Sequence, residues 1–89
     1  MAKLNKSANA TLMLNPEKGG GWLATFHVLT EGNLTVREVS AWKNASAGKR
    51  WIKAKVQEHT TRKSVKLNPI NFDANEKPIS FQGDLTFKA

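Results

Sequence analysis

The sequence predicts an α+β fold in which an antiparallel sheet of three to five strands packs on one helix. Three observations indicate this fold. Residues 22–29 alternate between two sets of side chains at the period of two that a strand requires. Residues 45–59 repeat their apolar positions at helical spacing. Residues 79–87 alternate again, so a strand is expected near the end of the chain.

The clearest element is a hairpin over residues 22–41. Its first strand carries apolar residues on one side, namely Trp22, Ala24, Phe26 and Val28. The next residues, Glu31-Gly32-Asn33, form a turn because they tolerate positive φ. The returning strand, LTVREVSA, has Val36 and Val39 at an odd spacing, which predicts a β-bulge or an ambiguous register.

The helix over about 45–59 follows Asn44, a residue type that caps helix N-termini. Gly48 costs a helix about 1 kcal/mol relative to Ala, and a close approach to the sheet would explain it. Lys55 falls inside the apolar arc and should extend its ammonium group outward. Hairpin and helix together supply the expected core, which consists of Trp22, Phe26, Val28, Trp51, Ile52 and Val56.

The N-terminal residues are expected to be less ordered than the hairpin. Residues 1–9 are interpreted as a flexible basic arm that carries Lys3 and Lys6, and residues 10–89 as a single domain. A short strand is expected at 10–14.

The residues after the helix predict an irregular extended segment and one more strand. Residues 64–72 are extended, but Pro69 excludes a central strand, and residues 73–78 form a turn. The last strand, around Phe81 to Phe87, either joins the sheet or extends it across a homodimer. Gly83 within it predicts a bulge or a bend.

The composition argues against several classes of protein. The 89 residues contain no Cys, so neither a disulfide framework nor a thiolate metal site is possible. No apolar run approaches the ~20 residues of a membrane-spanning helix. The start of the sequence, MAKLNKSANA, lacks the apolar segment of a secretory signal, so we expect a cytoplasmic protein. His27 and His59 are far apart and have no acidic cluster, so both are interpreted as structural. No metal, cofactor or catalytic site is predicted.

The excess positive charge lies in residues 43–66, which we call the basic window. The formal net charge of the chain is +7. The window contains eight basic residues and one acidic residue, Glu58, so it carries the whole excess, since eight minus one is seven. Its basic residues are Lys43, Lys49, Arg50, Lys53, Lys55, Arg62, Lys63 and Lys66. Such asymmetry predicts a polyanionic partner, although a solvated helix face is the simpler alternative.

We therefore predict a small non-catalytic protein that binds nucleic acid, with double-stranded DNA as the preferred partner. In one mode, a basic helix face and the following loop contact phosphates. The candidate residues for this mode are Lys49, Arg50, Lys53, Arg62, Lys63 and Lys66, with Lys3 and Lys6 from the arm. In the other mode, the outer face of the sheet reads the major groove, with His27 and Arg37 as candidates for base edges.

The segment GGGWLATFHVLTEGNLTVREVSAWKNASAGKRWIKAKVQ resembles the three-stranded-sheet-plus-helix DNA-binding domain of tyrosine-recombinase phage integrases and plant ethylene-response factors. As in that family, Trp22 opens a strand, Arg37 lies on the returning strand, and a short link leads to a helix that bears Trp51. The resemblance covers about half of the chain. It implies DNA binding without recombinase activity.

A second class of function stays open. The chain could be a small protein-binding module or inhibitor that docks on a host protein through its basic face or its terminal strand. The C-terminal third favours this class, because a terminal strand with several apolar residues either covers the core or presents an edge to another chain. Such an edge would also permit a homodimer.

Overall fold

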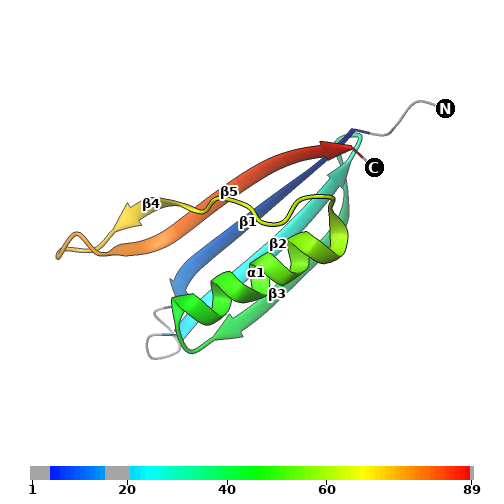
Figure 1. Cartoon of the computed structure of the whole chain (residues 1–89). Helices are drawn as coiled ribbons and strands as arrows, with labels where there is room; N and C mark the ends of the chain where they lie inside the picture. The colour runs from blue at the N-terminus through cyan, green and yellow to red at the C-terminus, as the bar shows by residue number, and fades with distance from the viewer. Residues whose placement is uncertain (1–4, 16–20, 89) are drawn as a thin grey trace.

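The computed structural model describes residues 5–15 and 21–88 and confirms the predicted α+β class. In chain order the elements of these residues are β1 (Asn5–Asn15), β2 (Gly21–Thr30), β3 (Asn33–Trp42), α1 (Ala45–His59), β4 (Asn68–Phe72) and β5 (Pro78–Lys88). The strands form one antiparallel sheet in the order β3-β2-β1-β5-β4. Helix α1 covers one face of the sheet over β1 to β3, and the β4–β5 hairpin extends away from it (Figure 1).

The core lies between α1 and the inner strands. Alternate residues of a strand point to the same face, and the register places Ala10 opposite Phe26 and Leu12 opposite Ala24 on the helix side. The buried hydrophobic residues are Ala8, Ala10, Leu12, Ala24, Phe26, Val28, Ile52, Val56 and Phe87. Four of the six predicted core residues are thus buried, whereas Trp22 and Trp51 are half-buried and pack against the core.

Strand β1 is longer and more central than predicted. Residues 5–9, which were expected in a flexible arm, form the first half of β1 and pair with both β2 and β5. The arm prediction was wrong for these residues, and residues 1–4 lie outside the described part of the chain. A small side chain such as Ala8 is enough to fill this part of the core, because the neighbouring strands place the larger Val28 and Leu85 beside it.

Helix α1 begins and packs as predicted. Asn44 is extended, with φ of −143°, and its Oδ1 accepts a hydrogen bond of 2.8 Å from the Ala47 N–H. Gly48 is buried against β1, where an added Cβ would lie 2.5 Å from Leu12 Cδ1. The glycine therefore permits the close approach of helix and sheet. At the other end of α1, the Thr60 N–H donates to the Val56 carbonyl over 2.9 Å.

The hairpin of β2 and β3 contains the irregularity that the spacing of its valines predicts. Val28 lies opposite Val36, but Leu29 lies opposite Leu34, so Thr35 is the extra residue of a bulge. The Thr35 hydroxyl donates to the Val28 carbonyl over 3.1 Å, which satisfies a backbone acceptor at the bulge.

Strand β5 joins the sheet between β1 and β4, and β4 is an edge strand, as Pro69 predicts. A bulge or a bend was expected at Gly83. The pairing of β5 with β1 is continuous through this residue, so there is no bulge in this register. Gly83 has a different role. It is buried because the backbone of Lys66 crosses it, and an added Cβ would collide with the Lys66 carbonyl oxygen.

Candidate nucleic-acid interface

Two positive side chains extend from the flank of α1 that faces β5. The Lys49 ammonium lies 4.4 Å from the centroid of the Phe81 ring, and Lys49 and Lys53 line the same cavity beside the helix. Arg50 points away from the sheet, because it lies about 160° around the helix from the buried Ile52. All three basic side chains are exposed.

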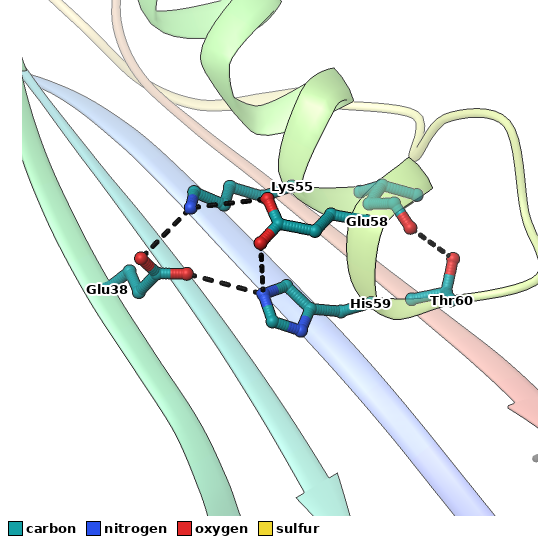
Figure 2. A network of polar contacts seen from close by, with 6 residues as sticks. Glu38, Lys55, Glu58, His59 and Thr60 are labelled. Atoms are coloured by element: carbon teal, nitrogen blue, oxygen red, sulfur yellow. Dashed lines mark hydrogen bonds and ion pairs between the residues drawn. The ribbon is translucent and has the colours of Figure 1, made fainter.

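The opposite flank of α1 carries a network in which basic and acidic side chains contact one another (Figure 2). Lys55 Nζ lies 3.0 Å from Glu38 Oε1 of β3 and 3.5 Å from Glu58 Oε2. His59 Nε2 lies 3.4 Å from Glu38 Oε2 and 3.6 Å from Glu58 Oε1, and its ring stacks on Phe26. The Lys55 ammonium group thus donates hydrogen bonds to two carboxylates at the rim of the apolar arc and does not end free in solvent.

The pKa values of this pair are shifted in opposite directions. The hydrogen bond from Lys55 lowers the pKa of Glu38, against a smaller opposing effect of burial. The same bond raises the pKa of Lys55. Both groups are therefore charged across the neutral range, and Lys55 contributes no free positive charge to the surface.

The segment between α1 and β4, residues 60–67, is held beside β5 (Figure 1). We call it the connection. Gln57 Nε2 of the helix donates to the Lys63 carbonyl over 3.0 Å, and Arg62 Nη2 donates to the Thr86 carbonyl over 3.4 Å. The first bond joins the backbone of the connection to α1, and the second joins the Arg62 side chain to the backbone of β5.

The connection has an apolar side and a basic side. Val65 and Leu67 are half-buried and pack against the core, whereas Arg62, Lys63 and Lys66 are exposed. Helix and connection together present six exposed cations, which we call the basic surface: Lys49, Arg50, Lys53, Arg62, Lys63 and Lys66.

Within the described residues, no carboxylate forms an ion pair with the basic surface. The acidic residue of the basic window, Glu58, contacts Lys55 and His59 instead. The remaining described carboxylates lie on β3, on the open face of the sheet and in the two hairpin turns, and are Glu31, Glu38, Asp73, Glu76 and Asp84. The positive potential of the basic surface is therefore not cancelled locally.

Two of the cavities that described residues line adjoin the basic surface. One, of about 240 Å³, lies between α1 and the connection, where its lining includes Lys49, Lys53 and Val65. The other, of about 350 Å³, is lined by Asn5, Lys6, Arg62, Thr86 and Phe87. Sequence reasoning assigned Lys6 to an arm and gave no sign of the second cavity, because it depends on the pairing of β1 with β5.

Arg37 lies apart from the basic surface, on the sheet face that α1 does not cover. Its neighbour Glu38 contacts the helix, and successive side chains of a strand alternate between faces. Arg37 is paired with His27 of β2, whose Nδ1 lies 3.0 Å from Asn9 Oδ1 of β1. The two predicted binding modes thus use opposite faces of the molecule. Lys3 lies outside the described residues.

No group of three or more His, Asp or Glu side chains in the described residues is arranged to hold a metal ion. None of the helical residues described here forms a segment with the length and apolarity needed to cross a bilayer.

Comparisons with protein-family models, with characterised proteins and with solved structures found no match. The resemblance to the integrase and ethylene-response DNA-binding domains therefore stays a prediction. The function has to be argued from the surface itself, since a fold class does not determine a function.

Proposed function

We propose that this protein binds nucleic acid without catalysing a reaction, and that double-stranded DNA is its preferred partner. The observation that carries the proposal is the basic surface, on which six exposed cations have no carboxylate partner in the described residues. Gathered like charges repel one another. A polyanion that neutralises them and releases its own counterions therefore gains free energy on binding.

The two flanks of α1 argue against a merely solvated helix. Surfaces without a partner usually mix both signs of charge, and the flank with Lys55 and Glu58 does so. The flank with Lys49 and Lys53 has no described acidic neighbour, although it belongs to the same helix. This contrast supports a function for the second flank.

The connection is suited to phosphate contacts because its backbone is already ordered. The hydrogen bonds of Gln57 to the Lys63 carbonyl and of Arg62 to the Thr86 carbonyl hold it in place. Less conformational entropy is therefore lost when the connection meets a ligand. Contacts to phosphates carry no sequence information, so binding of any duplex sequence is expected.

The salt dependence of binding tests the proposal. A fluorescently labelled duplex is titrated with the protein at two or more salt concentrations, and anisotropy gives the binding constant. If each cation of the basic surface neutralises one phosphate, the logarithm of the binding constant falls with the logarithm of salt with a slope of about −5. A slope near zero, or no binding at low salt, would refute nucleic-acid binding through this surface.

Two triple variants of equal net charge show whether binding depends on where the cations lie or only on the total charge. Lys49→Ala/Arg50→Ala/Lys53→Ala removes half of the basic surface and should reduce the slope by about three. Arg37→Ala/Lys43→Ala/Lys77→Ala removes three exposed cations elsewhere and should bind nearly as the parent does. If only the second variant loses affinity, the helix-face mode is wrong and the open sheet face becomes the candidate interface.

A second candidate function, docking on another protein, is favoured by the β4–β5 hairpin. Ile70 and Phe72 of β4 are 50% and 54% exposed, and both lie on an edge strand that extends beyond the helix (Figure 1). An exposed apolar edge strand is a known template for strand addition by a partner or a second copy. Light scattering of the nuclease-treated protein, compared with an Ile70→Lys/Phe72→Lys variant, tests whether this edge drives self-association.

A further inference from the structure

The cavity beside Lys6 is built from three parts of the chain. Asn5 and Lys6 begin β1, Thr86 and Phe87 lie near the end of β5, and Arg62 belongs to the connection. Its volume of about 350 Å³ lies near the lower end of the ~300–1,000 Å³ typical of ligand sites. The space therefore suits one small group and cannot admit a nucleic-acid duplex.

Two basic residues line this cavity and form no ion pair with a described carboxylate, Lys6 from the sheet and Arg62 from the connection. Two hydrogen bonds hold Arg62 in place. Its side-chain Nη2 donates to the Thr86 carbonyl, and its backbone N–H donates to Thr60 Oγ1 over 3.0 Å. One bond to a carbonyl leaves most of the five guanidinium N–H donors available. The site can therefore bind an anionic oxygen group such as a phosphate.

The rest of the cavity wall is mostly carbon and includes the buried Phe87. A bare inorganic anion would leave this apolar part of the wall in contact with water. A neutral apolar ligand would displace water from two cations without replacing their hydrogen bonds, which costs free energy. The combination fits a ligand that joins a phosphate to a small, largely apolar group.

Among the described residues, Glu31 is a carboxylate whose hydrogen bonds bring it next to Asn5 of the cavity lining. Its Oε1 accepts a hydrogen bond of 2.9 Å from the Asn5 N–H, and its own N–H donates to the Asn5 carbonyl over 2.9 Å. The Glu31 side chain is thus occupied by the backbone of β1 and is not part of the cavity lining.

We propose that this cavity holds one unpaired nucleotide of the bound nucleic acid, with its phosphate on Lys6 and Arg62 and its base or sugar against the wall that includes Phe87. The inference rests on the proposed function and deepens it. A base inside a duplex is stacked on both faces and cannot enter a cavity, whereas a base at a strand end or in a single strand can. Because Arg62 also belongs to the basic surface, the cavity would take an unpaired strand that continues from the phosphates held there.

Nuclear magnetic resonance with small probes tests the cavity directly. Thymidine 5′-monophosphate, inorganic phosphate and thymidine are titrated separately into the ¹⁵N-labelled protein. The monophosphate should produce saturable shifts at Asn5, Lys6, Arg62, Thr86 and Phe87 in the millimolar range, and each of the other two probes should bind more weakly. The Lys6→Ala/Arg62→Ala variant should lose these shifts, whereas Lys43→Ala/Lys77→Ala, of equal net charge and at exposed positions outside the cavity, should keep them. Absent shifts, or shifts that persist in the first variant, overturn the inference.

A pair of duplexes separates this inference from the proposed function. A duplex with a three-nucleotide single-stranded overhang should bind about tenfold tighter than the blunt duplex, a difference of ~1.4 kcal/mol, because the overhang adds a phosphate contact and an apolar contact in the cavity. Lys6→Ala/Arg62→Ala should remove that difference. Equal binding of the two duplexes with a steep salt dependence would leave the proposed function standing and overturn the cavity. Specific binding of the monophosphate with no binding of either duplex would reject the proposed function and support the cavity as a nucleotide site.

Discussion

The ammonium group of Lys55 lies 3.0 Å from the carboxylate of Glu38, so an ion pair joins helix α1 to β3 at the edge of the sheet (Figure 2). This pair has a consequence for function as well as for stability. It removes one of the eight cations of the basic window from the surface. The free positive charge of α1 is thereby confined to the outer side and the flank that faces the connection.

The ion pair predicts a pH dependence of stability that Glu38→Gln should remove. The pKa of Glu38 is lowered in the folded state, so its contribution is fully present above its ordinary value near 4.5 and is lost as the pH falls through the lowered value. The pKa of Lys55 is raised, so its contribution is present below its ordinary value near 10.5 and is lost as the pH rises through the raised value. Thermal unfolding of parent and variant between pH 2 and 11 should therefore differ most in the plateau and converge toward both ends.

A double-mutant cycle provides the control for this prediction. Glu38→Gln and Lys55→Gln each remove one member of the pair, and the double variant removes both. The two single changes should be non-additive, since the groups are in contact. Additive effects, or a difference between parent and Glu38→Gln that does not vary with pH, would show that the pair contributes nothing to stability.

The N-terminus of α1 predicts a loss of stability on Asn44→Ala. The Asn44 side chain accepts a hydrogen bond of 2.8 Å from the Ala47 N–H, one of the donors that has no partner inside the helix. Its removal should cost about 1 kcal/mol of unfolding free energy, measured by urea denaturation. Asn44→Asp keeps an acceptor at the same place and adds a favourable charge at the positive end of the helix dipole. It should match or exceed the parent in stability, and an equal loss in both variants would rule out the cap.

Much of the fold could be predicted because its signals are local. The strand of residues 22–29 repeats its apolar residues at the period of a strand, and the helix repeats them at the period of a helix. Both periods can be recognised from the segment itself, without the rest of the chain. The first half of β1, residues 5–9, gave no such signal, since its buried residue, Ala8, is too small to stand out among polar neighbours. The burial of Ala8 follows from the pairing of β1 with strands on both sides, which a local pattern does not contain.

The candidate site, like the fold, could be predicted from the sequence only in part. The concentration of charge in residues 43–66 is visible in the sequence. The neutralisation of Lys55 by Glu38 is not, because it depends on the position of β3 beside the helix. The presence of Lys6 and Arg62 in one cavity lining also depends on distant pairing, in this case of β1 with β5. The sequence therefore identifies most of the cations but not which of them lie near one another in the fold.

Gly48→Ala should destabilise the protein even though Ala is the better helix former. The added Cβ would lie 2.5 Å from Leu12 Cδ1, and Leu12 is fully buried, so the helix or the strand must move. Overpacking of this kind costs about 1–3 kcal/mol, against a gain of up to about 1 kcal/mol in helix propensity. Urea denaturation should show a net loss.

A compensating change tests the cause. Leu12→Val shortens the side chain that the new methyl group meets, so Gly48→Ala should be tolerated better in that background than in the parent. Ser46→Ala, on the exposed side of α1, serves as the control and should be neutral or slightly stabilising. A stabilising effect of Gly48→Ala in the parent would contradict the tight contact between α1 and β1.

Gly83→Ala should weaken nucleic-acid binding without changing any charge. The new Cβ would collide with the Lys66 carbonyl oxygen, which is backbone and cannot rotate away, so the connection must shift from β5. That shift would strain the hydrogen bond from Arg62 to the Thr86 carbonyl and move the cations of the connection relative to those of α1. Anisotropy with a labelled duplex should show lower affinity and a shallower salt slope than the parent.

Ser64→Ala is the control for Gly83→Ala. It changes a side chain of the same connection without touching its backbone, and it should bind as the parent does. If Gly83→Ala is folded and binds duplex with unchanged affinity and slope, the position of the connection is irrelevant and phosphate contacts must be made by α1 alone.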